Sequence, residues 1–424
     1  MRIHEVELFH FRNHTHTKVR WAPYINILIG PNGAGKTSIV DAIHYLCMSR
    51  SFVTSSDSHV VKQDTKSFLL RGHFEGQIRA QFQLALSYSR GDGKKIFVNE
   101  GPLDKLSDLI GMVPVVVLSP QDEQLTKGGP VERRVFIDAF ISQLSRSYLR
   151  NLMEYRQIRR QRNKLLQKYA EGGSFRVDKS LMQSYLEPWN EQLVRVGSKI
   201  IEERAQVIKQ LERFVQYNFT EISGLEMQPG MRYEAMVSGW EGDAEANLDK
   251  DLSKRDTKSD DKANTDVHLS NEHAMDDSPI SLTRLERIEQ CFREALRAQF
   301  DKELERGQSL VGPHRDEIVF YLSEVELRRY GSQGQHRLFA LALKLGQLDY
   351  YTKELEDAPL LILDDVFGDL DGDRVRILLE HLKAHKGQSF ITAAHPVAFS
   401  DFVDFDHPDH LCITIKNGNV VETN

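Results

Sequence analysis

Three short stretches of this chain carry the side chains that handle phosphate groups. Residues 30–37 read Gly-Pro-Asn-Gly-Ala-Gly-Lys-Thr, the G-x-x-x-x-G-K-[ST] pattern of a phosphate-binding loop. Residues 360–365 read Leu-Leu-Ile-Leu-Asp-Asp, an apolar strand ending in two carboxylates, as a magnesium site requires. Residues 330–335 read Tyr-Gly-Ser-Gln-Gly-Gln, a polar loop that opens a helix. Together these stretches predict a site for ATP and Mg²⁺.

Each residue type in the phosphate loop has a chemical role. Gly33 and Gly35 let backbone N–H groups approach phosphate oxygens closely, and the helix that follows directs its positive end at them. Lys36 is expected to reach the β- and γ-phosphates, and the Thr37 hydroxyl to hold Mg²⁺. The nucleotide-binding residues predicted from this loop are Gly30, Pro31, Asn32, Gly33, Ala34, Gly35, Lys36 and Thr37.

The acidic strand end supplies the rest of the predicted chemistry. Asp364 is expected to hold Mg²⁺ and Asp365 to polarise the attacking water. Because Asp365 is one methylene shorter than Glu, we expect slow hydrolysis. Gln121, after the apolar run 113–118, is expected to touch Mg²⁺ or that water, and His395, after 390–392, to contact the γ-phosphate.

The polar loop before the second half of the site has two interpretations. A Ser-x-Gly-Gln turn formed by Ser332, Gly334 and Gln335 can present a second anion site at a helix start, or it can simply cap that helix. One ATP has little use for two anion sites in one chain unless the second meets the γ-phosphate of another subunit. This reading predicts an ATP-bridged homodimer, with Asp371 placed to contact the partner.

The elements that position these residues predict an α/β fold split by an insertion. Residues 1–120 are rich in strand patterns, and a helix pattern covers 37–46 directly after the phosphate loop. Two long helices fit near 140–170 and 178–220, with a Gly pair at 172–173 between them. We expect a composite ATPase head from 1–138 and 300–424, with a helical lobe at 139–299. Residues 237–280 lose all periodicity and are expected to form a disordered insertion.

Charge is distributed unevenly. Residues 241–280 hold 12 acidic and five basic residues, which accounts for the formal net charge of −7 of the whole chain. Residues 146–168 hold eight basic residues and one acid. Such a helix can neutralise DNA phosphates, although a solvated helix face has the same composition. The candidate DNA contacts are Arg146, Arg150, Arg156, Arg159, Arg160, Arg162 and Lys164.

Composition and the N-terminus bound the class of protein. The chain is 40% hydrophobic and 28% charged, which is ordinary for a globular protein. No stretch approaches the roughly 18 apolar residues of a membrane helix, and the N-terminus lacks the apolar core of a signal peptide. We expect a cytoplasmic protein without membrane contact.

The assembled motifs resemble the RecF family of bacterial recombination-mediator ATPases, over nearly the whole chain except 237–280. The resemblance is carried by Leu8–Asn13, the phosphate loop, Ser119–Asp122, Lys127–Pro130 with Arg133 and Arg134, Gly312–Asp316, Tyr330–Gln335 and Leu363–Phe367. The Gly-Pro-His-Arg-Asp run and the Asp-Asp pair are particular to it. Such proteins are similar in their heads to ABC ATPases of the structural-maintenance-of-chromosomes (SMC) group.

The resemblance implies ATP-dependent dimerisation, slow DNA-stimulated ATP hydrolysis and binding to double-stranded DNA near single-strand gaps. It implies work with RecO and RecR in recombinase loading, at stalled forks and in SOS induction. It makes Ser332 the signature serine acting in trans and Asp371 the D-loop aspartate at the dimer contact. Two features depart from the family: the D-loop reads Gly-Asp-Leu-Asp instead of the usual Ser-Glu-Leu-Asp, and the acidic insertion is additional.

Two other functions fit part of the pattern. The ATPase subunit of a membrane transporter shares the phosphate loop, but such subunits lack an inserted helical segment this long and basic. A chromosome-organising SMC-like protein shares the split head, but it needs a coiled coil far longer than 140–222 can supply, at about 1.5 Å per residue.

Overall fold

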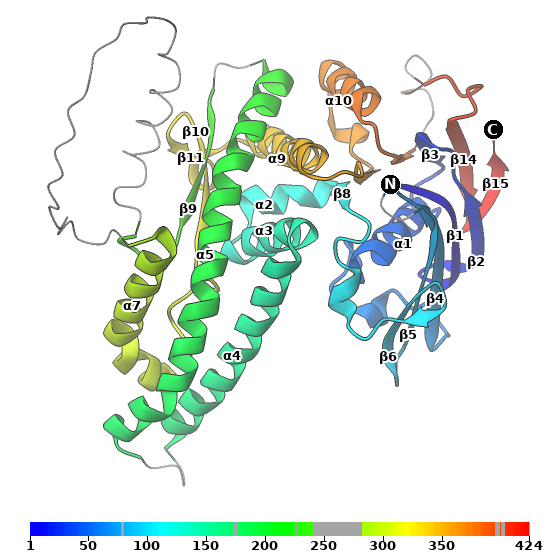
Figure 1. The fold of residues 1–424 in the computed structure, drawn as a ribbon. Coiled ribbons are helices and arrows are strands. Elements are labelled where there is room, and N and C mark those ends of the chain that lie inside the picture. The colour runs from blue at the N-terminus through cyan, green and yellow to red at the C-terminus, as the bar shows by residue number, and fades with distance from the viewer. Residues whose placement is uncertain are drawn as a thin grey trace, which may run out of the picture. The chain divides into compact units, whose positions relative to one another are not determined.

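The computed structural model describes residues 1–77, 80–172, 177–224, 227–240, 282–394, 399 and 403–423. Two compact units are formed by segments that alternate along the chain. The first contains 1–149, 206–233 and 318–424, and the second contains 150–205 and 234–317. Figure 1 shows the elements of both. The head boundaries at 138 and 300 remain a prediction.

A mostly parallel sheet forms the centre of the first unit. Its strand order is β15-β14-β3-β13-β12-β8, and the strands are β3 (Ile25–Ile29), β8 (Val115–Leu118), β12 (Leu360–Asp364), β13 (Ser389–Ala393), β14 (His410–Lys416) and β15 (Asn419–Thr423). All neighbours pair in parallel except β14 with β15. The carboxyl ends of β3, β12, β13 and β8 therefore meet at one edge, where ligands bind in such sheets.

A second, antiparallel sheet packs beside the first. Its order is β2-β1-β4-β5-β6-β7, built from β1 (Arg2–Phe11), β2 (His14–Arg20), β4 (Ser67–Glu75), β5 (Phe82–Ser89), β6 (Gly93–Val98) and β7 (Gly101–Pro102). Helix α1 (Lys36–Met48) contacts both sheets (Figure 1). Nearly every α1 residue is buried, so the helix after the phosphate loop is fixed on all sides by the core.

The first unit also contains several further helices and a small third sheet. Its order is β11-β10-β9, from β9 (Pro229–Glu234), β10 (Glu317–Leu322) and β11 (Val325–Glu326). The helices are α2 (Glu123–Lys127), α3 (Pro130–Leu144), α8 (Leu327–Tyr330), α9 (Gln333–Glu354) and α10 (Gly372–Ala384). Short 3₁₀ turns lie at Asp57–His59, Leu106–Leu109, Pro120–Asp122 and Phe367–Asp369.

Three long helices dominate the second unit: α4 (Arg146–Glu171), the first half of α5 (Lys179–Ser223) and α7 (Arg284–Arg306). They run side by side (Figure 1), joined by ion pairs of Arg195 with Glu154 and of Arg293 with Glu191. Helix α5 is continuous across the boundary between the units.

The Gly-Pro-His-Arg-Asp run, 312–316, ties this bundle together. A Cβ on Gly312 would lie 2.4 Å from the Tyr155 hydroxyl, at a φ of +122°. That hydroxyl lies 2.7 Å from Nδ1 of His314. Asp316 pairs with the buried Arg204 of α5 at 3.4 Å. The run therefore holds α4 and α5 to one loop.

The structure differs from the sequence-based expectations at two places. The helix expected near 140–170 is two helices, because the chain breaks at Ser145 with an extended φ of −126°. Residues 237–240, assigned to a disordered insertion, are packed: Val237 and Trp240 are buried, and the indole N–H donates to Val237 O at 2.8 Å. The rest of that insertion lies outside the described residues.

No helix in the described part of the chain is long and apolar enough to cross a membrane.

Candidate nucleotide site

The phosphate loop connects the end of β3 to the start of α1. Gly30 has a φ of +149°, and a Cβ there would lie 2.3 Å from Ile415 O. Gly35 has a φ of +109°, and a Cβ would lie 2.6 Å from the Asn13 side chain. These conformations and close approaches allow only glycine. No side chain of the described residues caps α1, so its first N–H groups are available to an anion.

Lys36 is folded back over the loop. Its Nζ donates to Gly30 O at 2.7 Å and to Pro31 O at 3.1 Å. Burial lowers the pKa of Lys36, and the charges of Asp365 and Asp364 oppose that shift. An ammonium held by carbonyls between carboxylates and a helix N-terminus is suited to exchange those carbonyls for phosphate oxygens.

The two ends of the chain meet at the Asp364 carboxylate. The Thr37 hydroxyl of α1 and the Thr392 hydroxyl of β13 both donate to Asp364 Oδ1, each at 2.8 Å. Burial raises the pKa of Asp364, which hydrogen bonds from the two threonines partly offset. A carboxylate beside a hydroxyl is a donor set that suits Mg²⁺.

Asp365 extends from the end of β12 into the same cleft. Its backbone is left-handed, with a φ of +54°, and its N–H donates to the Thr392 hydroxyl at 3.0 Å. Thr392 thus fixes both aspartates, although its sequence position gave no sign of this. The cleft has a volume of about 360 Å³ and is lined by Arg12, Asn13, Asn32, Gly33, Gly35, Lys36, Thr37, Ser38, Asp365 and Thr392.

Two further wall residues, Arg12 and Asn13, escaped sequence-based assignment. Arg12 Nε donates to Asp41 of α1 at 2.8 Å, and its guanidinium also reaches Ser51 at 3.1 Å. Burial raises the pKa of Asp41, and Arg12 partly offsets this. The sequence signal for both residues is the Leu8–Asn13 run, which carries part of the family resemblance.

Gln121 is not among the residues that line the cleft. It is exposed in the turn Pro120–Asp122 that follows β8. The turn is fixed by Asp122, whose Oδ2 accepts from Ser119 N at 2.7 Å. Since β8 neighbours β12, this turn leaves the same edge of the sheet as Asp364.

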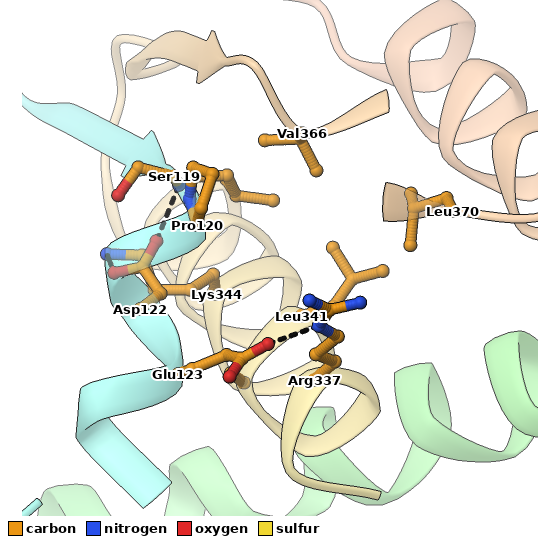
Figure 2. A pocket seen from close by; sticks show the side chains of 11 residues that line it. Ser119, Pro120, Asp122, Glu123, Arg337, Leu341, Lys344, Val366 and Leu370 are labelled. Atoms are coloured by element: carbon orange, nitrogen blue, oxygen red, sulfur yellow. Dashed lines mark hydrogen bonds and ion pairs between the residues drawn. The ribbon is translucent and has the colours of Figure 1, made fainter. Parts of the chain in front are cut away.

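The Gln121 turn is also tied to helix α9. Glu123 pairs with Arg337, and Asp122 lies 3.6 Å from Lys344 Nζ. Both acids line a cavity of about 60 Å³ together with residues of α9 and with Val366 and Leu370; Figure 2 shows these side chains. The loop that follows β12 therefore shares a cavity with the Gln121 turn and the helix after Ser332.

The polar loop at Ser332 caps α9. Its hydroxyl accepts from Gln335 N at 3.3 Å, and the Gln335 side chain accepts from Ser332 N at 2.7 Å. Gly334 and Ser332 are exposed. As far as the described residues form the cleft, none of these three lies in its wall. The Ser332 hydroxyl therefore caps α9, and the solvent-exposed side of the turn remains accessible.

Asp371 does not line the cleft either. Asp371 caps α10, accepting from Arg374 N at 3.1 Å, and its side chain is 56% exposed. His395 lies outside the described residues, so its expected contact stays a prediction.

The basic residues of α4 separate into two groups. Arg146, Arg150, Arg156, Arg160 and Lys164 are exposed, and Arg159 is half-buried. Arg162 is 1% exposed and pairs with Glu303 at 2.5 Å, while its other nitrogens donate to Asn190 and Ser309. The expected DNA contact of Arg162 is therefore wrong: all three nitrogens already serve the core.

Comparison with known proteins places this chain in a family. The family model described as RecF/RecN/SMC N terminal domain matches residues 2–406. A DNA replication and repair protein RecF of Salinibacter ruber is 37% identical over 99% of this chain and 91% of its own length. The protein of that name in Chloroherpeton thalassium is 32% identical, over 95% of this chain and 97% of its own.

Solved structures agree. The recombination mediator protein RecF-ATP of the RecFOR pathway superposes with a TM-score of 0.79 at 27% identity, covering 100% of this chain and 99% of that one. An Smc head domain with an extended coiled coil, derived from Pyrococcus furiosus, gives a TM-score of 0.52 at 12% identity, covering 100% and 96%. The second likeness concerns the fold alone, and together they confirm the expected α/β head architecture.

Proposed function

This chain belongs to the RecF family of DNA replication and repair proteins, and we propose that it is an ATP-dependent clamp on double-stranded DNA. The observation that carries this proposal is the meeting of Thr37 and Asp364 at one cleft. A phosphate loop and an acidic strand end over 300 residues apart in sequence become one site, which suits an ATPase head.

ATP would occupy the cleft with its phosphates against residues 30–37. The backbone N–H groups at the start of α1 and the Lys36 ammonium would bind the β- and γ-phosphates, and Lys36 would leave Gly30 O and Pro31 O. Thr37, Asp364 and Gln121 would hold Mg²⁺, which when bound neutralises phosphate charge and orients the terminal phosphoryl group. The close Thr37–Asp364 pair supports this assignment.

Asp365 would accept the proton of the attacking water. Its exposed carboxylate lines the cleft beside Lys36, and Thr392 fixes its backbone. His395 would contact the γ-phosphate. A short, left-handed Asp at the position of the base supports slow hydrolysis.

The exposed residues away from the cleft would act on a second copy of the chain. Ser332, Gly334 and Gln335 present the N-terminus of α9, a long helix, to the outside, where it can receive a γ-phosphate. Asp371 presents an exposed carboxylate at the start of α10. Neither the Ser332 turn nor Asp371 lines the nucleotide cleft of the same chain. Both would gain a role if ATP bound in one copy were contacted by the other copy.

Double-stranded DNA would lie along one face of α4. At about 100° per residue, Arg150, Arg160, Lys164 and Lys168 fall within about 80° of arc and span about 27 Å of helix. All four are exposed. The buried Leu152, Tyr155 and Leu166 lie on the opposite side. This arrangement gives a lengthwise basic stripe suited to phosphates.

The biological setting follows from the family. We propose that the chain acts in the cytoplasm at single-strand gaps in DNA, with RecR and RecO, in recombinase loading, fork recovery and SOS induction. The RecFOR pathway named for the solved relatives supports RecR and RecO. RecF relatives that match nearly end to end favour this setting over the transporter and SMC-like alternatives, because the Smc likeness is only 12% identical.

The steady-state ATPase rate, with and without gapped double-stranded DNA, tests the proposal. We expect a slow rate that DNA stimulates and Lys36→Ala abolishes. Ser332→Arg should retain ATP binding but lose the ATP-dependent dimer, whereas Ser332→Ala should keep the dimer. A rate indifferent to DNA at low salt would remove the DNA-coupled part of the proposal.

A further inference from the structure

The second half of helix α5 packs against two helices that begin at proposed dimer contacts. Helix α9 starts after Ser332 and α10 after Asp371. Asn218 of α5 is completely buried and bonds to both helices: to Asp349 of α9 at 2.6 Å and to His381 of α10 at 2.9 Å. One side chain thus joins three helices within the first unit.

The orientation of the Asn218 amide is fixed by its partners. Nδ2 donates to Phe214 O at 2.9 Å and to Asp349 Oδ2 at 2.6 Å, so both of its protons have acceptors. The carbonyl oxygen therefore faces His381, and His381 Nε2 must carry the proton that it donates. Reversing the amide would set its oxygen against two other oxygens.

Helices α5 and α9 pack closely against each other near Asn218. A Cβ on Gly346 of α9 would lie 3.1 Å from Val215 N, so a glycine lets the two backbones approach. Tyr350 donates to Gln210 at 2.6 Å. Burial raises the pKa of Asp349, and the Asn218 hydrogen bond and His381 oppose this shift. Loss of Asn218 would leave a buried acid without its amide donor.

Helix α5 also reaches the proposed DNA-binding helix. In the second unit, Arg195 of α5 pairs with Glu154 of α4 at 3.2 Å. Glu154 lies within the basic segment 146–168 of α4, within about four helical turns of each of its basic residues. A continuous helix therefore bonds to α4 in one unit and to α9 and α10 in the other.

We propose that Asn218 is a positioning residue that couples DNA binding on α4 to ATP turnover, by holding α9 and α10 in a fixed relation to α5. This inference rests on the proposed function. Asn218 touches no part of the nucleotide cleft, so its effect would pass through Ser332 and Asp371 at the ends of the helices it holds.

Asn218→Leu removes all three hydrogen bonds and keeps the branching and the number of non-hydrogen atoms of the side chain. We expect ATP affinity, measured with a fluorescent ATP analogue, to stay within about twofold, and the basal ATPase rate within about threefold, because the cleft is untouched. The ratio of DNA-stimulated to basal rate should fall at least about fivefold, a factor that corresponds to about 1 kcal/mol of coupling. Thr220→Ala, which alters an exposed α5 residue two positions away, is the matched control.

A second pair of variants separates coupling from folding. His381→Gln keeps a side-chain N–H for Asn218 and should retain DNA stimulation, whereas His381→Leu should lose it. An unchanged stimulation ratio in both Asn218→Leu and His381→Leu would overturn the inference. If instead the wild-type rate does not respond to gapped DNA, the proposed function fails first and the inference falls with it.

If Asn218→Leu does not fold, the two His381 variants test the inference alone, because Gln supplies a side-chain N–H donor to Asn218 and Leu does not. Thermal melting of each variant, without ATP or DNA, establishes which are folded. Equal loss of stimulation in His381→Gln and His381→Leu would contradict a role for the Asn218 hydrogen bond.

Discussion

The Thr37 hydroxyl donates to Asp364 Oδ1 at 2.8 Å, across 327 positions of sequence. The contact joins the first residues of α1 to the last residue of β12. It forms because β3 and β12 are both parallel to β13, which lies between them, so their carboxyl ends meet. The sheet topology thus assembles a magnesium-suited pair from the two ends of the chain.

Removal of the Thr37 hydroxyl should weaken the binding of Mg²⁺ but not the recognition of the nucleotide itself. Thr37→Val keeps the side-chain volume but lacks the oxygen ligand, so the Mg²⁺ concentration for half-maximal ATPase activity should rise at least about tenfold. Thr37→Ser keeps the hydroxyl and is the control. A Mg²⁺ titration of both variants is the measurement, and equal curves would argue against Thr37 as a ligand.

The charge of Asp364 should destabilise the ATP-free fold at neutral pH. Burial raises the pKa of this carboxyl, and a carboxyl with a raised folded-state pKa stabilises the fold below its unfolded pKa, a contribution lost as the pH rises through the folded pKa. Asp364→Asn should therefore melt at a higher temperature than the wild type at neutral pH. The gap should shrink as the pH falls toward about 4; thermal melts across that range would contradict this if the gap stayed constant.

The phosphate loop and the acidic strand end were predictable because each is contiguous in sequence. The order of residue types in each motif is typical of a nucleotide site, and the strand and helix patterns beside each motif predict its position in the fold. Arg12 and Thr392 were not predictable as cleft residues. Each reaches the cleft through pairing between strands or helices, Arg12 by way of Asp41 and Thr392 by way of β13, which no local pattern encodes.

For the helical segments, the sequence predicts the helices but not which of their side chains are buried or where one helix ends and the next begins. Periodicity predicts that 146–168 is helical, but not which arginine turns inward, because the buried partner of Arg162 is Glu303, 141 positions away. The break at Ser145 also escaped, since no Gly or Pro marks it. The composition of the residues that follow predicts disorder for 237–240, yet Val237 and Trp240 are buried because their apolar side chains pack.

Lengthening the Asp365 side chain should accelerate hydrolysis. Asp365→Glu moves the carboxylate further into the cleft, and we expect a rate increase of about tenfold from a better-placed base. The φ of +54° favours Asp over longer residues, so stability should fall by about 1 kcal/mol. Asp365→Asn keeps the shape without the base and should be slower than the wild type. Single-turnover rates of the three proteins decide, and a Glu variant as slow as the Asn variant would refute the role.

Two substitutions on the α4 stripe should weaken DNA binding through phosphate contacts. Arg150→Gln with Arg160→Gln should reduce the slope of log affinity against log salt by about 2, at little cost in stability because both residues are exposed. Lys179→Gln with Arg376→Gln removes two exposed cations elsewhere and serves as the control. Affinity for gapped DNA over a range of salt concentrations is the measurement, and equal slopes in both double variants would contradict the stripe.

Arg162, by contrast, should affect folding and leave DNA binding unchanged. Glu303→Leu leaves the Arg162 charge buried and unpaired, and breaking such a pair costs about 3–5 kcal/mol. Adding Arg162→Met removes that charge and should recover most of the stability. The midpoints of urea unfolding measure both effects. Because Arg162 is 1% exposed, the folded double variant should bind gapped DNA within about twofold of the wild type; a large loss of affinity in a stable double variant would show that this buried arginine does reach DNA.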